Sequence, residues 1–178
     1  MQLSRDAIIA AAVDILDTYG LADMSMRRVA TSLNVAPGAL YWHIANKQQL
    51  ITAIAEEILA PVLADAAPDT TAALADLLRE CMLSRRDGAE LVAAALAQPD
   101  SGTRGDVEKQ LEITLPGDGD LRRIGAAALL HLVLGATALE QARTQHAADT
   151  GAPPPAEASA DFRRGVEILL TGLDLCRG

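Results

Sequence analysis

Aromatic residues are scarce in this sequence, which has one tryptophan, two tyrosines and one phenylalanine among 178 residues. Two of them, Tyr41 and Trp42, stand next to each other and are followed by His43. Adjacent residues on a helix point about 100° apart, so these three side chains cannot all face a core. We therefore expect at least one of the two rings to lie at the surface and to serve in binding rather than in packing.

Cysteine is equally scarce. Cys81 and Cys176 have no CxxC spacing, and the three histidines are dispersed, so the sequence predicts neither a metal site nor a cofactor. Both cysteines fall within predicted helices. This placement indicates half-buried thiols in a reduced, cytoplasmic protein.

The chain also lacks a long uninterrupted apolar run. Its N-terminus has no apolar segment of the signal-peptide type. The most apolar stretch, residues 124–139, is interrupted by His131 and falls short of the roughly 20 residues that a membrane span needs. We expect this stretch to form a buried helix with a hydrogen-bonded histidine, and we expect no membrane partner.

Positive charge is in the minority, because 15 lysines and arginines face 24 acidic residues, for a formal net charge of −9. An anionic protein is repelled by nucleic acid unless its charges are unevenly distributed. Here they are uneven: no acidic residue occurs between Asp23 and Glu56, whereas Arg27, Arg28 and Lys47 lie in that window. An anionic partner is therefore expected to bind at this segment.

Helical periodicity runs through nearly the whole chain, and strand-like alternation does not occur, which predicts an all-α fold. Helix starts are marked by Ser4, Ser25 and Asn46, the last with Gln49 as its capping-box partner. Pro61 is expected to end or kink the helix that Asn46 starts. Residues 99–106 are expected to form a loop, the turn 116–120 to cap the next helix, and residues 151–155 to form a linker. The expected helices cover about 4–20, 26–33, 37–43, 47–61, 70–86, 89–98, 107–114, 120–147 and 159–176.

The joint at residues 34–37 has the local chemistry of a helix-turn-helix. Asn34 suits the left-handed conformation that a tight turn between helices requires. Pro37 suits the first position of the following helix, where its missing N–H costs nothing. Val35 and Leu40 are expected to be the buried spacers that set the angle between the two helices. A second helix held in this way can enter the major groove of DNA.

Arg27 and Arg28 are expected in the first turn of the helix after Ser25, where the helix dipole disfavours cations by roughly 0.3–1 kcal/mol each. A DNA phosphate at that helix end would turn the penalty into a gain. Solvated surface arginines are the alternative. Lys47, at the start of a later helix, is a third cation placed to reach the same backbone.

Two segments of the sequence resemble the tetracycline-repressor branch of the TetR family of transcriptional regulators. Residues 40–47, LYWHIANK, followed by Leu50, resemble the recognition helix and the start of the next helix in that family. Residues 83–89, LSRRDGA, resemble the family's link between two later helices. The resemblance implies a dimeric repressor with an N-terminal reading head, residues 1–46, and a ligand-binding and dimerisation body, residues 47–178.

The resemblance also implies which residues contact palindromic double-stranded operator DNA. Gly38 and Ala39 stand where the family carries larger polar side chains, so the operator is expected to differ from the tetracycline operator and to be read by Arg27, apolar contact and DNA shape. The implied DNA-contact residues are Met26, Arg27, Pro37, Gly38, Ala39, Tyr41, Trp42, His43 and Lys47.

Two later helices carry more apolar surface than one partner helix can cover, and small residues among them allow close approach. A four-helix interface between two copies of the chain accounts for this surface, as the resemblance also implies. The core of a monomeric helical bundle is the alternative. A second apolar stripe consists of Ile168, Gly172 and Leu175. The expected interface residues are Ile124, Ala128, Gly135, Phe162, Val166, Leu169, Leu170 and Leu173.

A small-molecule inducer is expected to bind in the body, but the sequence does not identify it. The family's two metal-drug histidines correspond to Leu63 and Val92 here, which argues against a magnesium–tetracycline ligand. Glu140 lies near the family's acidic pocket position, and Met82 and His131 are further lining candidates.

Two other classes of function remain open from the sequence. An enzyme could use Cys81 with His131 as nucleophile and base, but no orienting third residue accompanies them. A helical protein that only binds other proteins would leave the acid-free window and the adjacent Tyr41 and Trp42 unexplained.

Overall fold

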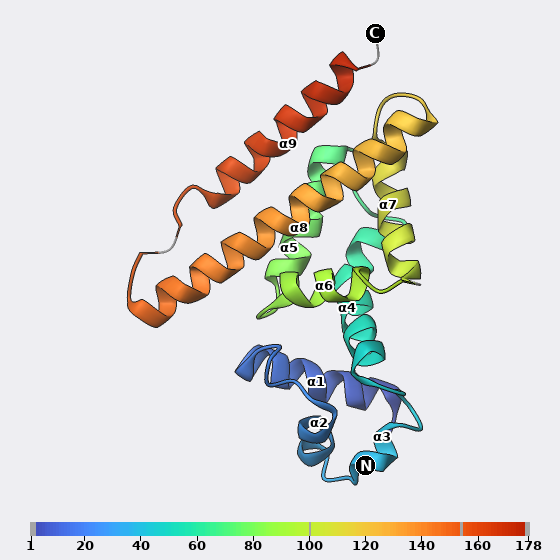
Figure 1. The fold of residues 1–178 in the computed structure, drawn as a ribbon, viewed down its shortest axis with the longest axis vertical. Helices are drawn as coiled ribbons and strands as arrows, with labels where there is room; N and C mark the ends of the chain where they lie inside the picture. The colour runs from blue at the N-terminus through green and yellow to red at the C-terminus, as the bar shows by residue number, and fades with distance from the viewer. Residues whose placement is uncertain (1–2, 100, 154, 177–178) are drawn as a thin grey trace.

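The computed structural model describes residues 3–99, 101–153 and 155–176, and in these ranges it contains nine helices and no strand. The all-α prediction is confirmed. Three N-terminal helices form a small head at one end of the molecule, and α4 leads from it into a larger helical body (Figure 1). The two long C-terminal helices, α8 and α9, run side by side along the body (Figure 1).

The head consists of α1 (Arg5–Tyr19), α2 (Met26–Ser32) and α3 (Pro37–Leu40). The hydroxyls of Ser4 and Ser25 accept hydrogen bonds from backbone N–H groups three residues on, so both predicted N-caps are confirmed. Gly20 ends α1 as predicted, in a conformation with a positive φ of 89°.

Helix α4 (Lys47–Leu63) joins the head to the body. Its N-cap is confirmed: Gln49 donates its backbone N–H to Asn46 Oδ1 at 2.8 Å. The reciprocal bond of the predicted capping box is shifted by one residue, because Gln49 Oε1 accepts from the N–H of Ala45 at 3.0 Å instead of from that of Asn46. Pro61 does not end the helix itself. The helix runs on to Leu63, because a proline in the last turn removes only one hydrogen bond from an element that is about to end.

The middle of the body consists of α5 (Thr71–Leu83), α6 (Gly88–Leu96) and α7 (Gly102–Thr114). The predicted loop over residues 99–106 is too long, since α7 already begins at Gly102. Ser101 caps this helix by accepting from the N–H of Arg104, and the buried Thr103 anchors its first turn. Capping and burial outweigh the low helix propensity of two glycines. Asp100 lies outside the described residues.

The last two helices are α8 (Gly119–Thr150) and α9 (Ala158–Leu175). Asp118 caps α8, as the turn at 116–120 predicts, but α8 continues three residues beyond its expected end at Ala147. Gly151 in the left-handed conformation stops it. Within the predicted linker 151–155, Pro154 lies outside the described residues.

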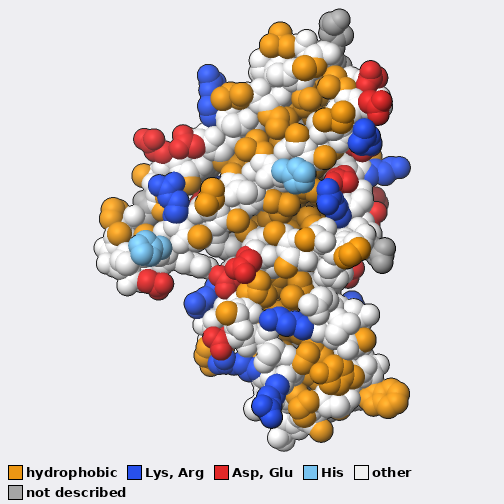
Figure 2. All heavy atoms as spheres, in the orientation of Figure 1, with side chains coloured by type: hydrophobic (Ala, Val, Ile, Leu, Met, Phe, Trp, Pro, Cys, Tyr) orange, Lys and Arg blue, Asp and Glu red, His pale blue; other side chains and the backbone are white. Residues whose placement is uncertain are grey.

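By length and composition, α8 is the one helix of the described ranges that could cross a membrane. It packs against α5, α6, α7 and α9, yet only a third of its most apolar window is buried. Hydrophobic side chains are visible along this side of the body in Figure 2. The predicted buried helix is therefore buried on one face only, and its outer apolar face is open.

Three predictions about single residues of the body are wrong. His131 is exposed on α8 rather than hydrogen-bonded in a core. Cys176 is exposed at the end of α9, and Cys81 on α5 is buried, so neither thiol is half-buried. An apolar run in the sequence does not reveal which of its faces the rest of the same chain covers.

Candidate nucleic-acid interface

The turn between α2 and α3 fixes how the second helix is presented. Asn34 adopts φ of 53°, the left-handed conformation predicted for it. Its N–H donates to the carbonyl of Thr31 at 3.1 Å, and the N–H of Val35 donates to the carbonyl of Ala30 at 3.0 Å. These two bonds form a Schellman motif, which satisfies the last carbonyls of α2 and sets the direction of the chain into α3.

Pro37 occupies the first turn of α3, as predicted. Two buried side chains anchor this segment to the core of the head. Leu40 and Ile44 are almost completely buried in the core of the head. The helix ends at Leu40 instead of continuing to His43, and residues 41–43 form a turn closed by the N–H of His43 donating to Leu40 O at 2.9 Å. Burial at both ends of this turn forces the three side chains between Leu40 and Ile44 outward.

These three outward side chains are Tyr41, Trp42 and His43. Trp42 is 90% exposed and Tyr41 is 53% exposed, and His43 is also exposed. Large aromatic side chains normally bury much of their surface in a folded protein. A tryptophan left in solvent on a rigid turn is therefore available to bind a partner, and the prediction that at least one ring is at the surface is confirmed.

The basic side chains of the head and of the adjoining start of α4 differ in whether they already have a partner within the protein. Arg28 pairs with Asp23, with Nη1 2.6 Å from Oδ1, and its guanidinium carbon lies 3.8 Å from the centroid of the Tyr19 ring. Arg27 is exposed and Lys47 is half-buried, and among the described side chains neither has an ion-pair partner. Arg27 of the head and Lys47 at the start of α4 are therefore available to an anionic ligand, while Arg28 is neutralised within the protein.

The other expected DNA-contact residues are placed as follows. Pro37 and Gly38 are exposed, and Ala39 is half-buried. A Cβ added to Gly38 would meet no atom within 4 Å, so the start of α3 is open to solvent. Met26 is only 8% exposed and packs in the core, so its side chain does not belong to the surface that Arg27 presents. Figure 2 shows basic and exposed hydrophobic side chains together at the head end of the molecule.

The expected dimer-interface residues separate into two groups. Ile124, Ala128 and Gly135 are exposed along one face of α8. Phe162 and Val166 of α9 are buried within the chain, because this stripe packs inward on α5 and α8. Leu169, Leu170 and Leu173 are half-buried in the same seam. The exposed apolar face of α9 is formed by its second stripe, that of Ile168, Gly172 and Leu175. On α8 the solvent-exposed apolar residues of this surface are Ile124, Ala128, Gly135 and Leu139.

The five expected ligand residues are not gathered around one cavity. Met82 and Val92 are fully buried in the core, and Leu63 and His131 are exposed on different helices. Glu140 is held by Arg79, in an ion pair whose side chains are 9% exposed for Arg79 and 16% for Glu140. In this structure these side chains serve packing, pairing or surface roles rather than one shared site.

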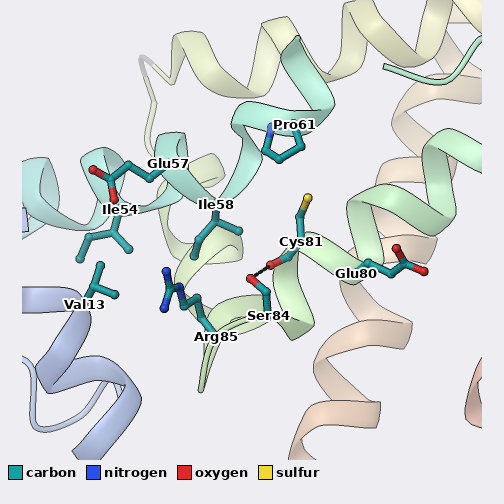
Figure 3. A pocket seen from close by; sticks show the side chains of 9 residues that line it. All are labelled: Val13, Ile54, Glu57, Ile58, Pro61, Glu80, Cys81, Ser84 and Arg85. Atoms are coloured by element: carbon teal, nitrogen blue, oxygen red, sulfur yellow. Dashed lines mark hydrogen bonds between the residues drawn. The ribbon is translucent and has the colours of Figure 1, made fainter. Parts of the chain in front are cut away.

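A cavity of about 340 Å³ lies between α1, α4 and α5 (Figure 3). Its apolar wall is formed by Val13, Ile54, Ile58 and Pro61, and the buried Cys81 lies on the α5 side. Burial, and next the negative charge of Glu80, raise the pKa of the Cys81 thiol above its ordinary value. A thiol kept protonated in this way is a poor nucleophile, which does not suit the alternative of Cys81 as a catalytic residue.

Comparisons with known proteins show which family the N-terminal part of the chain resembles. Residues 8–54 match the family model described as bacterial regulatory proteins, tetR family. The class E tetracycline repressor of Escherichia coli is 30% identical over 191 residues, covering 96% of this chain and 90% of that protein.

Solved structures agree over almost the whole chain. BioQ of Mycobacterium smegmatis is 37% identical with a TM-score of 0.86, covering 97% of this chain and 98% of the other. BioQ with its natural double-stranded DNA operator is 36% identical with a TM-score of 0.81, at 97% and 98% coverage. A variant of TetR from Acinetobacter baumannii AYE, in complex with minocycline, is 26% identical with a TM-score of 0.79 and covers 99% of each chain. This chain belongs to the TetR family and is a DNA-binding transcriptional repressor, not an enzyme.

Proposed function

We propose that two copies of this chain bind a palindromic operator through residues 41–43, Arg27 and Lys47, and that a small molecule releases them. The observation that carries the proposal is the turn after α3, on which Tyr41 and Trp42 project into solvent. Arg27 and Lys47, which have no ion-pair partner among the described side chains, add positive charge to the same end of the chain. Apolar rings can contact thymine methyl groups and the sugar backbone, and the cations can neutralise phosphates. The relative BioQ has been crystallised on its operator.

The open face of α8 and α9 supports the homodimer. Its α8 residues recur at positions 124, 128, 135 and 139, which lie on one side of a helix. A second copy would cover this face and would remove from water the surface that makes α8 apolar enough for a membrane. Gly135 and Gly172 have no atom within 4 Å of an added Cβ, which leaves room for close approach of a partner helix. Two heads related by two-fold symmetry would read half-sites about 34–36 Å apart, or a multiple of that distance.

Ligand release is proposed from the family together with the cavity between α1, α4 and α5. An A. baumannii relative binds minocycline, but the positions of Leu63 and Val92 carry no metal-binding side chain here, so we propose a different inducer. Residues 1–46 would read DNA, residues 47–178 would sense the inducer and dimerise, and the protein would act in the cytoplasm.

Selection of bound duplexes from a random DNA pool tests the proposal. The proposal expects an enriched inverted repeat, which shifts in a mobility assay as a complex of two chains with one duplex. A matched duplex in which one half-site is scrambled should bind far more weakly. Enrichment of no sequence, or of a sequence without two-fold symmetry, would contradict dimeric operator binding.

A further inference from the structure

The turn between α5 and α6 joins three parts of the molecule through one carboxylate. Asp87 Oδ2 accepts the backbone N–H of Leu21, in the link between α1 and α2, at 2.8 Å. Asp87 Oδ1 accepts the side-chain N–H of Gln145, on α8, at 2.6 Å. The partners of Asp87 lie 66 and 58 residues away in sequence, so this is a tertiary contact between the head, the turn and the longest helix.

The backbone around this carboxylate is shaped to bring the segments close. Asp87 has a positive φ of 52°, and Gly20, next to Leu21, has φ of 89°. A Cβ added to Gly20 would lie 2.6 Å from Asp87 Oδ2, which is closer than real Cβ contacts. Only glycine at position 20 permits the approach that the hydrogen bond to Leu21 needs.

Neighbouring contacts hold the same joint. Arg85 pairs with Asp17 of α1 at 2.8 Å, and the backbone N–H of Arg86 donates to the other oxygen of Asp17 at 3.3 Å. On the opposite side, Gln141 of α8 donates to Arg85 O at 2.7 Å and accepts from the N–H of Ala89 at 3.0 Å. The turn is therefore bonded to α1 on one side and to α8 on the other.

We propose that Asp87 is a positioning residue for DNA binding, which sets the orientation of the reading head relative to α8. The head already packs on α4 through α1, and Asp17 of α1 is bonded to the turn, but none of these contacts ties the head to α8. The Asp87 carboxylate adds that link, because its two oxygens bond to Leu21 of the head and to Gln145 of α8. Because α8 carries the proposed dimer face, fixing the head to α8 also fixes it relative to the head of the second copy. This inference rests on the proposed dimeric binding of a palindrome.

The side chain at position 87 can be changed without disturbing the turn. Asparagine tolerates the left-handed conformation, but its single carbonyl oxygen can accept only one of the two N–H groups, and its NH2 opposes the other. Asp87→Asn therefore breaks the bridge and keeps the backbone. Gln145→Met removes the donor on α8 with a side chain of similar length. Thr144→Val, at an exposed neighbouring position of α8 without a side-chain hydrogen bond to the described residues, is the matched control.

The test compares affinity for the full palindrome with affinity for a single half-site, at several salt concentrations. Asp87→Asn and Gln145→Met should weaken palindrome binding by roughly tenfold or more, which is the effect of losing one hydrogen bond to a charged group. Half-site affinity and the dependence on salt should stay unchanged, since no phosphate contact is lost. A merely structural role would instead lower both affinities together with the melting temperature.

Hydrogen exchange of the Leu21 amide gives a readout that needs no DNA. In Asp87→Gly, which keeps the left-handed backbone and removes both acceptor oxygens, this amide should exchange at least about fivefold faster than in the wild type, and in Thr144→Val it should not change. The proposal is overturned if Asp87→Asn and Gln145→Met both bind the palindrome as Thr144→Val does, or if palindrome and half-site affinities fall by the same factor. If the wild type binds no palindrome, the dimeric operator proposal fails, and unchanged Leu21 exchange in Asp87→Gly would separately refute the bridge.

Discussion

Arg79 of α5 and Glu140 of α8 form an ion pair inside the body, with Nε 2.8 Å from Oε2 and a second bond between Nη2 and Oε1. The Phe162 ring of α9 lies against the same guanidinium, whose central carbon is 5.5 Å from the ring centroid. One buried cation thus links three helices. Two parallel bonds from an arginine to a carboxylate fix the relative position of the helices that carry them.

Removing one partner of this pair should destabilise the fold strongly. Arg79→Met leaves the Glu140 carboxylate buried without a cation, at a cost of about 3–5 kcal/mol. Arg79→Met combined with Glu140→Leu should recover much of that loss, because no unpaired charge remains. Urea unfolding of the two single variants and the double variant measures the coupling. Additive losses would show that the pair does not act as a unit.

Arg27 and Lys47, which have no ion-pair partner among the described side chains, should contribute more to DNA binding than the paired Arg28. Lys47→Ala should weaken binding to all sequences about equally and should reduce the salt slope by roughly 1, because one phosphate contact is lost. Arg28→Ala should leave the slope unchanged, since Asp23 already neutralises Arg28. Affinities measured over a range of salt concentrations compare the two. Equal slopes for Lys47→Ala and wild type would mean that Lys47 touches no phosphate.

The open face of α8 gives a prediction for the dimer. Gly135→Glu places a charge in the proposed interface, and an added Cβ there meets no atom of its own chain within 4 Å. The dimer dissociation constant should rise by at least about tenfold, because an unpaired carboxylate would be buried. Gly105→Glu on α7, which has equal free space within the chain, is the matched control. Sedimentation velocity measures the dimer dissociation constant of both variants. An unchanged constant for Gly135→Glu would mean that the dimer interface does not include this face of α8.

The two cysteines should react with thiol reagents at different rates. Burial and the nearby Glu80 raise the pKa of Cys81, so at a given pH less of it is the reactive thiolate. Cys176 is exposed. In single Cys→Ser variants, Cys81 should be modified more slowly than Cys176, and its rate should keep rising to higher pH. A Cys81 as fast as Cys176 at neutral pH would contradict the packing of α5 against α4.

Local signals in the sequence predict much of the head. Caps at Ser4, Ser25 and Asn46 are each confirmed by a hydrogen bond to a residue three positions on. Asn34 and Pro37 likewise act within their own turn. Such features depend on residues that are neighbours in the chain, and therefore the sequence contains them directly.

Features that depend on distant residues could not be predicted in the same way. His131 interrupts an apolar run, but which face of α8 the chain covers is decided by α5, α6, α7 and α9. From the sequence alone, the apolar stripe that contains Phe162 could form either a dimer interface or part of the core of one chain. In the structure it lies in the core. The turn at Asp87 signals a helix stop, whereas its bonds to Leu21 and Gln145 leave no local pattern.

Trp42 itself permits the most direct test of DNA binding by the turn after α3. It is the only tryptophan of the chain and is 90% exposed, so its fluorescence reports on this surface alone. Iodide should quench the emission of the free protein efficiently, and saturating operator DNA should shield it. Trp42→Ala should impair DNA binding and leave the melting temperature nearly unchanged. Operator binding without any change in iodide quenching would contradict the account, because the ring would then lie outside the DNA contact.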